Sequence, residues 1–398
     1  MARLEELTAE IGSARIEVRP TRAEIDLDAI VHNAKEIRQW VGAGVGLCAV
    51  VKADAYGHGA VPVVHALFHH GSVDAVAVSL VEEGIELRRA GVRGPILVMG
   101  GVYTGAHREI LASDLTPVIS DLGDVHALAA AASSFGVRAK VHLKVDTGMA
   151  RLGVREENLP AFLAELPRVP QVEIVGACTH LASADAEDNL ATEDQLARFE
   201  RMLLALRSEG IFPLVVHAAN TAATFRFRAA HYSAVRPGLA LYGGGLPPSS
   251  VTLRPAMRLV SAIAQLRDVR EGDAVSYGAL WRAKGRARLA TLPIGYADGY
   301  PRRLTGNSEV LVLGRRCPVV GAICMDMTVV DVTHLGDQVH VGDQVVLLGS
   351  QGNERVTAEE LASRAGLIEY EITCGVSKRV PRVAVVRSQA FGGSGEAS

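Results

Sequence analysis

Residues 47–59 read Leu-Cys-Ala-Val-Val-Lys-Ala-Asp-Ala-Tyr-Gly-His-Gly, an apolar run that stops abruptly at Lys52. The run has the composition of a strand buried on both faces. An ammonium group rarely ends such a strand unless it is paired or takes part in chemistry. The stretch therefore leaves two interpretations open: a lysine that simply leaves the core for solvent, or an amine that forms an imine.

Similar apolar runs recur along the chain and predict eight strands, at 47–51, 73–80, 96–99, 116–119, 140–145, 172–179, 214–217 and 233–242. Stretches with helical spacing lie between them, at 60–70, 81–90, 106–112, 122–135, 156–165, 188–210 and 221–229. Before the first strand, Asp28 is the expected N-cap of a helix that runs to about Gln39. This alternation predicts parallel β-α units, in either an open doubly wound sheet or a closed barrel.

Polar residues recur where the predicted strands end, which favours the barrel because barrel enzymes build their active sites at that face. They are Lys52, Lys144, Asp146, His180, Asn220, Thr221 and Arg236. The sequence therefore predicts an α/β fold with a (β/α)8 TIM-type barrel, and polar side chains from different strands meeting at one rim.

After about Arg254 the helical spacing largely disappears, and short β-rich runs alternate with Gly, Asp and Asn turns. This predicts a second, mainly antiparallel β domain, interrupted by one helix at 358–365. The expected organisation is an N-terminal extension (1–22), the barrel (23–254), the β domain (255–388) and a disordered tail (389–398).

The composition limits the classes of function. Net charge is −3 without a basic block, so nucleic acid is not an expected partner. No apolar run reaches the roughly 18–20 residues that span a bilayer, so no membrane association is expected. Five widely spaced cysteines without a CxxC pair indicate reduced thiols and a cytoplasmic protein. The histidines lack the companions of a metal site, so no metal is expected.

A lysine at a barrel rim suggests a Schiff base to pyridoxal phosphate, provided that a phosphate site lies nearby. Asn220-Thr221 opens a helix, where hydroxyl and N–H groups favour a phosphate, although the pair also fits a plain N-cap. Gly238 follows Arg236-Pro237 and would let backbone amides approach the same group.

Residues 49–59 closely resemble the cofactor-lysine signature of bacterial alanine racemases, and Lys144-Val-Asp-Thr-Gly-Met-Ala-Arg-Leu-Gly153 resembles their second block. Further similar stretches lie in order at 179–180, 217–220, 235–238, 276–278, 294–300 and 324–326. The resemblance runs from about Ala23 to Arg382 and so covers both expected domains. It implies a homodimer with an active site shared between subunits.

The resemblance implies a two-base mechanism on a pyridoxal phosphate aldimine. Lys52 would hold the cofactor and act as one base, and Tyr277 of a partner subunit would be the other. Racemisation needs proton removal on one face of the α-carbon and delivery on the other, which suits two such groups. From the residue alone, Tyr277 is also compatible with a turn tyrosine that packs the β domain.

The other implied cofactor contacts are Tyr56, Arg151, His180, Asn220, Thr221, Arg236, Gly238 and Leu239. Arg236 would face the ring nitrogen and keep its own proton, which favours simple reprotonation over transamination. A structural arginine pairing across the rim is the alternative.

The resemblance also implies three groups that contact the substrate: Arg151, the backbone N–H of Met325, and Tyr296 at the entrance from the partner subunit. Lys144 matches a position that is often carbamylated in the family, while an unmodified Lys144 paired with Asp146 is the alternative. One departure is Lys378, which stands where the family has tyrosine or arginine; it leaves open how Tyr277 is held.

The sequence therefore predicts an isomerase, an alanine racemase that interconverts L- and D-alanine and supplies D-alanine for peptidoglycan synthesis. A broad-specificity or serine racemase on the same frame is the alternative within the class. The stretches around Tyr277 and Met325 resemble those of racemases, which argues against a fold-related pyridoxal decarboxylase. A non-catalytic pyridoxal phosphate-binding barrel is the alternative from another class, and such proteins lack the β domain.

Overall fold

The computed structural model describes residues 18–103 and 105–385 of the 398-residue chain. Within that part the chain forms two compact units, one of residues 26–256 with 384–385 and one of residues 18–25 with 257–383. We call them the barrel unit and the β unit. The tail expected at 389–398 and residues 1–17 of the expected extension lie outside the described residues.

The barrel unit contains a closed ring of eight parallel strands in the order β5-β4-β3-β2-β10-β9-β8-β6, which β5 closes by pairing with β6. The strands are β2 (Gly46–Val50), β3 (Ala75–Val78), β4 (Ile96–Val98), β5 (Thr116–Ile119), β6 (Ala139–Asp146), β8 (Val172–Cys178), β9 (Val215–His217) and β10 (Ala234–Val235). A two-residue strand, β7 (Val154–Arg155), adds to β6. All eight predicted strands are present, and the closed ring confirms the barrel over the open sheet.

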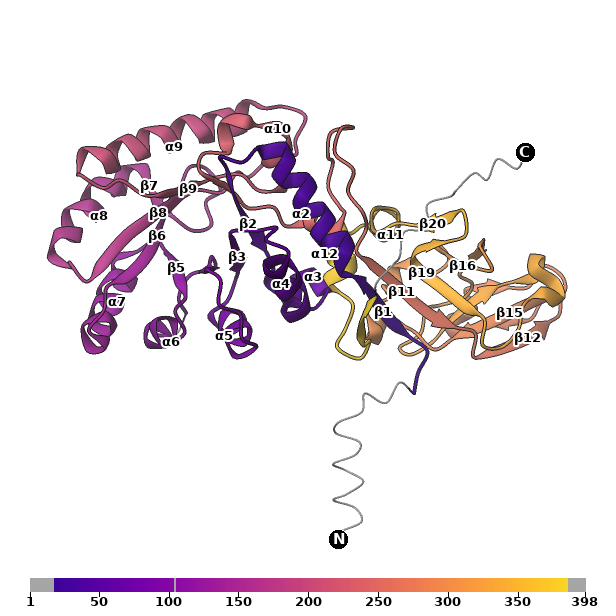
Figure 1. Ribbon diagram of the computed structural model, residues 1–398. Helices are drawn as coiled ribbons and strands as arrows, with labels where there is room; N and C mark the ends of the chain where they lie inside the picture. Colours follow the sequence, from indigo (N-terminus) through magenta and orange to yellow (C-terminus); the bar gives the residue numbers. More distant parts are fainter. Residues whose placement is uncertain (1–17, 104, 386–398) are drawn as a thin grey trace, which may run out of the picture. The chain divides into compact units, whose positions relative to one another are not determined.

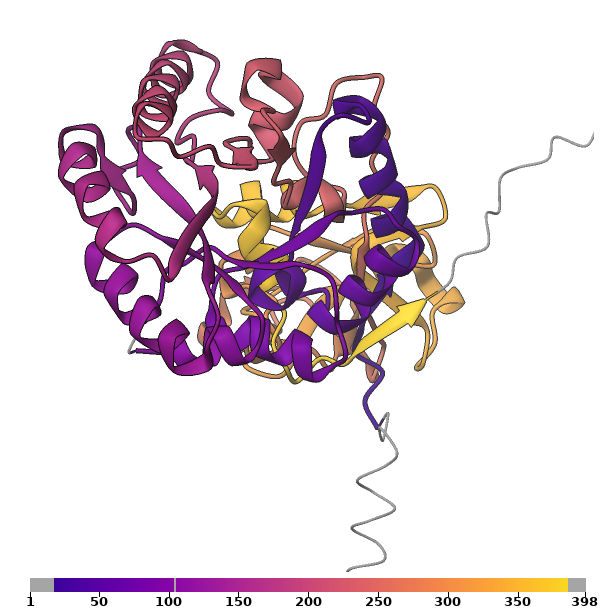
Figure 2. The ribbon, with the colours of Figure 1, turned by 60° about the vertical axis from the view of Figure 1, so that its left-hand side comes forward.

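Helices surround the strands, as Figure 2 shows for the barrel unit in indigo to pink. They are α2 (Leu27–Val41), α3 (Lys52–Gly57), α4 (Ala60–His69), α5 (Val81–Arg89), α6 (His107–Ala112), α7 (Leu122–Phe135), α8 (Leu159–Glu165), α9 (Leu190–Ser208) and α10 (Thr221–Arg226). Most strands are covered on both faces and read as short apolar runs, whereas β6 alternates apolar residues with Lys140, His142, Lys144 and Asp146.

Two details of the barrel differ from the prediction. The eighth strand ends at Val235 instead of extending to Tyr242, because Pro237 has no N–H for the ladder and residues 239–242 form a 3₁₀ turn. Arg236 therefore follows the strand. The N-cap of α2 is Asp26 rather than Asp28, since the Asp26 carboxylate accepts a hydrogen bond from the Ala29 N–H at 2.8 Å.

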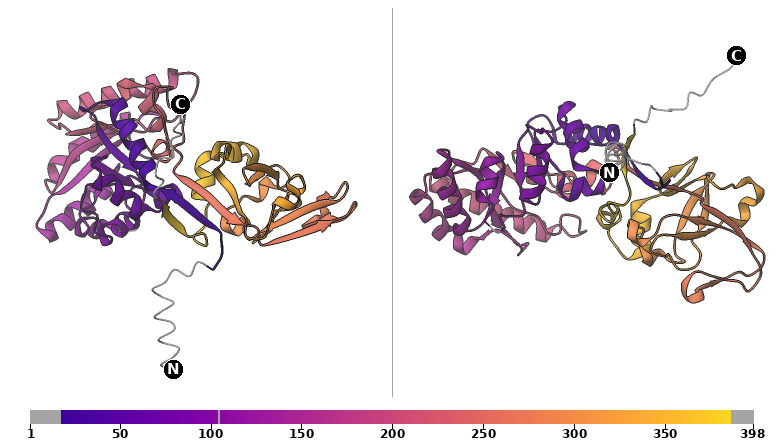
Figure 3. Two further views of the ribbon diagram at one scale, coloured as in Figure 1. Left: turned by 45° about the vertical axis from the view of Figure 1, so that its right-hand side comes forward. Right: turned by 90° about the horizontal axis from the view of Figure 1, so that it is seen from below.

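The β unit is built on antiparallel pairs, as predicted for the second domain (Figure 3, orange to yellow). Its largest sheet has the order β17-β16-β19-β11-β1-β21, with β20 on β19; a second contains β12, β15 and β18, and a third β13 and β14. The strands are β11 (Met257–Ala262), β12 (Gln265–Val269), β13 (Ala274–Val275), β14 (Trp281–Arg282), β15 (Ala287–Leu292), β16 (Glu309–Val312), β17 (Arg315–Pro318), β18 (Thr328–Asp331), β19 (Gln344–Gln351), β20 (Glu354–Val356) and β21 (Arg382–Val385).

The helix predicted at 358–365 is present as α11 (Ala358–Ala365), and a second helix, α12 (Glu369–Cys374), was not predicted. Strand β1 (Arg22–Asp26) precedes the barrel in the chain but pairs with β11, beside which it lies in Figure 1. The range 23–254 expected for the barrel thus begins with a strand whose hydrogen bonds lie in the β unit. Within the described residues, no helix is long and apolar enough to cross a membrane.

Replacing the N-cap tests the corrected start of α2. We expect Asp26→Ala to destabilise the first turn by about 1 kcal/mol, because the Ala29 N–H loses its acceptor. Asp28→Ala is the matched control and should cost only about 0.3 kcal/mol through the helix dipole. Hydrogen exchange of the first-turn amides of α2 measures both effects; equal acceleration in the two variants would contradict the assignment.

Candidate active site

The polar residues predicted to gather at one rim do follow the carboxyl ends of the barrel strands. Lys52 comes after β2 and Arg236 after β10, and Lys144 lies near the carboxyl end of β6. His180 follows β8 by two residues, and Asn220-Thr221 follows β9 and opens α10. Since neighbouring parallel strands end at the same edge, all of these residues belong to one face of the barrel.

Lys52 leads directly into an unusual backbone segment. Residues 53–56 all have left-handed dihedrals, with φ between 52° and 55°. For residues with a Cβ this conformation costs about 1–2 kcal/mol each, so the surroundings must hold it. Glu83 accepts from the Ala53 N–H at 2.6 Å, and Asp54 accepts from the Ala60 N–H at 2.7 Å. This turn brings Tyr56 back into the barrel, where the side chain is buried.

Tyr56, Thr221 and Gly238 form a small polar cradle beside the rim. A Cβ on Gly238 would overlap the Tyr56 hydroxyl, so only glycine leaves room for this phenol. The Thr221 hydroxyl accepts from the Gly238 N–H at 3.0 Å and from the Ala240 N–H at 3.4 Å. Hydroxyl and N–H groups of this kind are suited to an anionic oxygen such as that of a phosphate.

Asn220 serves as the N-cap of α10, which was the simpler of its two interpretations. Its side-chain oxygen accepts from the Ala223 N–H at 3.0 Å, and its amide donates to the Leu181 carbonyl at 3.3 Å. Because both ends of the amide are engaged, Asn220 orders the start of α10, where Thr221 stands.

Arg236 is buried in the barrel and is held by its two terminal nitrogens. Nη1 donates to the carbonyl oxygen and to Nδ1 of His217, at 2.8 and 2.5 Å. Nη2 donates to the carbonyl oxygens of Thr179 and Ala218, at 2.8 and 3.1 Å. Among the residues that the structure describes, Nε makes no hydrogen bond, so one N–H of the guanidinium is available for a further acceptor.

Sequence reasoning assigned no role to His142 and His217, which continue this network. His142 Nδ1 lies 2.7 Å from His217 Nε2, and both side chains are buried. The two histidines stand on β6 and β9, and Gly176 of β8 lies between them; a Cβ there would come within 2.5 Å of the His142 ring. The signal was a glycine inside a predicted strand, which marks a close approach of another group.

The histidines of the site are neutral. Burial, helped by Arg236, lowers the pKa of His142 to about 4 and that of His217 well below its usual value. Burial also lowers the pKa of His180 to about 3. Four cations near His180 add to this effect: Arg236, Lys144, Arg151 and Lys52. Their joint influence on one ring shows that the cationic residues of the rim lie around His180.

Lys144 is half-buried, and burial lowers the pKa of its amine. No ion pair within 4 Å joins Lys144 to Asp146 in the described part of the chain. The Asp146 carboxylate instead accepts from the N–H groups of Gly148 and Ala150, both at 3.0 Å. Asp146 therefore shapes the loop that leads to Arg151, and the expected alternative of a Lys144–Asp146 pair is not formed.

The β unit presents its three candidate residues on adjoining loops. Ser276 donates to the Ala322 carbonyl at 2.6 Å and so holds the loop of Tyr277. The N–H groups of Tyr296 and Ala297 donate to the carbonyls of Cys324 and Met325, both at 3.0 Å. The side chains themselves are exposed, at 74% for Tyr277, 52% for Met325 and 41% for Tyr296.

Lys378, the departure from the family pattern, is exposed in the β unit. The neighbouring Arg379 makes the structural contacts: it pairs with Asp326 at 2.7 Å and with Asp298 at 3.3 Å. Because Asp326 follows Met325, Arg379 steadies the Met325 loop, and the lysine at 378 is not needed for this.

No group of three or more metal-ligating side chains occurs in residues 18–103 and 105–385.

Comparison with known proteins gives matches along nearly the whole chain. Residues 25–245 match the family model of the alanine racemase N-terminal domain, and residues 256–384 that of the alanine racemase C-terminal domain. An alanine racemase from Geobacter sulfurreducens is 45% identical, over 92% of this chain and 97% of the relative.

Solved structures agree with these matches. The alanine racemase of a D-cycloserine-producing Streptomyces lavendulae is 36% identical with a TM-score of 0.88, covering 93% of this chain and 98% of the other. An alanine racemase from Bartonella henselae with covalently bound pyridoxal phosphate is 29% identical with a TM-score of 0.83, covering 92% and 99%.

The cradle can be tested at Gly238. We expect Gly238→Ala to weaken binding of pyridoxal phosphate by about tenfold, or about 1.4 kcal/mol, because the added methyl group displaces the Tyr56 hydroxyl. Titration of the cofactor-free protein, followed by visible absorbance, measures the affinity. Gly44→Ala is the control, since a Cβ at Gly44 meets no atom within 4 Å. If Gly238→Ala bound pyridoxal phosphate with unchanged affinity, the cradle would not be part of the cofactor site.

Proposed function

Because this chain belongs to the alanine racemase family and is therefore a racemase, we propose that it interconverts L- and D-alanine with pyridoxal phosphate as cofactor. D-alanine for peptidoglycan synthesis would be its product in the cell. Free cysteines at all five positions support the cytoplasm as its location.

The observation that carries the cofactor assignment is the available Nε–H of the buried Arg236, which stands on the same barrel rim as Lys52. Lys52 would bind the cofactor aldehyde, Arg236 its ring nitrogen, and the cradle of Tyr56, Thr221 and Gly238, with the neighbouring Leu239, its phosphate. When bound, pyridoxal phosphate withdraws electrons from the substrate amino acid and so acidifies the proton on its α-carbon. The described residues fit this group in charge and hydrogen-bonding capacity.

We assign the proton transfers to Lys52 and Tyr277. One group would take the α-proton from one face of the substrate and the other would return a proton to the opposite face. The neutral His180 would orient the Tyr277 phenol without adding a positive charge. The high exposure of Tyr277 supports a role in which it enters the site of a second copy of the chain.

Arg236 also bears on the type of reaction. A guanidinium keeps its proton in proteins, so the ring nitrogen that it binds would stay unprotonated. This limits electron withdrawal and favours return of the proton to the α-carbon over transfer of the amino group. Arg151 and the Met325 N–H would bind the substrate carboxylate, and Tyr296 would border the entrance.

A homodimer follows from this assignment, since Tyr277 would act in the partner's site. Two exposed apolar side chains support such an interface: Leu280, three residues after Tyr277, and Met327, two residues after Met325. Sedimentation of the holoenzyme would show a dimer.

The activity is tested by circular dichroism of purified holoenzyme with L-alanine and, separately, L-serine. Decay of ellipticity to zero, fastest with alanine, would support the proposal. Faster decay with serine would favour a serine or broad-specificity racemase. A coloured protein that leaves both substrates unchanged would favour a cofactor-binding protein without catalysis.

The two-base assignment predicts that Tyr277→Phe lowers racemisation at least about 100-fold, the range for loss of a general acid or base. The visible absorbance of the bound cofactor should remain, because Lys52 is untouched. Tyr103→Phe, at another exposed tyrosine, is the control and should keep full turnover. Unchanged turnover in Tyr277→Phe would eliminate this tyrosine as a base.

We further propose that Lys144 is carbamylated. Its half-burial, lowered pKa and proximity to Arg151 and Arg236 support reaction of the neutral amine with carbon dioxide, which would give an anion that orients Arg151. With ¹³C-bicarbonate, the protein should show a carbamate carbon signal that Lys144→Arg lacks. Lys140→Arg, at an exposed lysine of the same strand, should retain the signal; its absence from the unmutated protein would refute carbamylation.

A further inference from the structure

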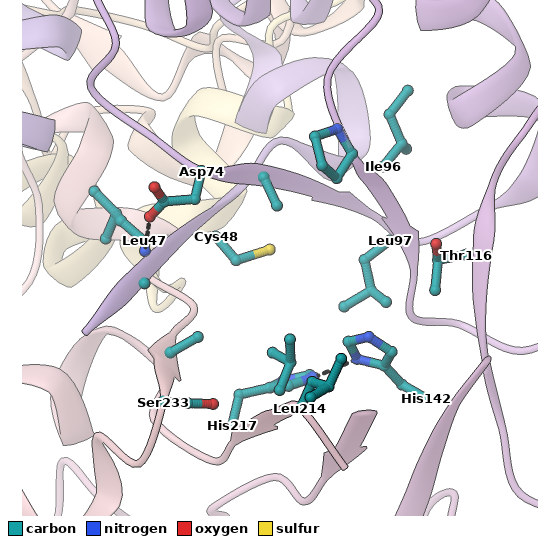
Figure 4. Close-up of a pocket in the computed structure, with 15 residues that line it drawn as sticks. Leu47, Cys48, Asp74, Ile96, Leu97, Thr116, His142, Leu214, His217 and Ser233 are labelled. Atoms are coloured by element: carbon teal, nitrogen blue, oxygen red, sulfur yellow. Dashed lines mark hydrogen bonds between the residues drawn. The ribbon is translucent and has the colours of Figure 1, made fainter. Parts of the chain in front are cut away.

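A cavity of about 300 Å³ opens at the amino-terminal ends of the barrel strands, away from the candidate active site (Figure 4). Its wall includes the first residues of several strands, such as Gly46, Ile96, Val215 and Ala234. Leu214 lies at the cavity and is 82% exposed, so the entrance is apolar as well. The volume lies at the lower end of the range of small-molecule sites.

Most polar groups that line the cavity are already engaged. Asp74 accepts from the Leu47 N–H at 2.7 Å and pairs with Arg38 at 2.6 Å. Ser233 Oγ accepts from the Val216 N–H and donates to the Val216 carbonyl, at 2.6 and 3.0 Å. Burial raises the pKa of the Cys48 thiol to about 12, so that thiol stays neutral.

His142 differs from these groups, because the hydrogen-bond chain behind it determines its tautomer. Arg236 can only donate, so His217 Nδ1 accepts. The neutral His217 then carries its proton on Nε2 and donates it to His142 Nδ1. His142 must carry its own proton on Nε2. The ring faces the cavity, and the described residues supply no acceptor for this N–H, although the residue as a whole is only 8% exposed.

A donor that faces a cavity without a protein acceptor can form a hydrogen bond with a molecule that enters the cavity. We propose that the cavity binds a small, neutral, mainly apolar molecule whose carbonyl oxygen accepts a hydrogen bond from His142 Nε2–H. A charged ligand is disfavoured, because the one carboxylate at the cavity is paired with Arg38 and the walls are largely apolar. The site is distinct from the proposed catalytic site; binding in the cavity does not depend on the proposed function, whereas its coupling to a bound cofactor rests on it.

The same chain of hydrogen bonds connects the cavity with the rim. A ligand that bonds to His142 polarises the His142–His217 pair and thus the nitrogen that Arg236 contacts. Occupancy of the cavity should therefore shift the visible absorbance maximum of a cofactor bound near Arg236. By thermodynamic linkage, any effect on cofactor affinity is matched by an equal effect of the cofactor on the ligand.

The test uses 4-fluoroacetophenone as probe and ¹⁹F NMR of the intact holoenzyme as readout. We expect a saturable shift, with an affinity about tenfold higher than that of 1-ethyl-4-fluorobenzene, which has a similar shape without the carbonyl. Equal affinities for the two probes would overturn the role of His142. The absence of saturable binding for both would overturn the site.

Variants locate the binding. Leu97→Phe fills the cavity from β4 and should abolish the shift, while Leu204→Phe, at an exposed position of α9, should leave it unchanged. Should Leu97→Phe fail to fold, Leu214→Glu at the exposed entrance places a charge beside an apolar probe and should weaken binding severalfold. Binding that survives both Leu97→Phe and Leu214→Glu would overturn the assignment to this cavity.

Discussion

The barrel unit depends on one buried charge, the guanidinium of Arg236. Burying a cation costs several kcal/mol unless its N–H groups find acceptors. Here three backbone carbonyl oxygens at the ends of β8 and β9 and one imidazole nitrogen accept from its terminal nitrogens. The arginine therefore ties together the loops that follow two strands, and its position is set by backbone atoms that cannot easily move.

Burial, helped by the charge of Arg236, keeps the histidines around it neutral, since it lowers the pKa of His142, His180 and His217. For His217 and His142 the hydrogen bonds from Arg236 onward also define which ring nitrogen donates and which accepts. A hydrogen-bonded chain thus runs from Arg236 at the rim through His217 to His142 at the cavity. A chain of this kind can convey a change in one hydrogen bond to the next, which is the physical basis of the proposed coupling between the two sites.

Close approach between backbone and side chains is the second recurring constraint. The left-handed turn at 53–56 returns Tyr56 to the barrel, and Gly238 leaves the space that its hydroxyl occupies. Gly176 leaves the space through which two imidazole rings meet across a strand. In the β unit, hydrogen bonds between the loops at 276, 296 and 324–325 present the three substrate-side candidates together.

The sequence by itself determined the barrel with all eight strands, the antiparallel second domain and the positions of the rim residues, because these follow from local patterns of apolar residues and from strand ends. It was also sufficient to identify the resemblance to alanine racemases, because that resemblance consists of short motifs in a fixed order along the chain. Only the tertiary structure decided the pairing of β1 with β11, the N-cap at Asp26 and the hydrogen bond between His142 and His217. It also showed that Lys144 and Asp146 do not form an ion pair and that a cavity lies at the other end of the barrel. These features depend on contacts between residues far apart in the chain, and on the space left between them, neither of which a local pattern records.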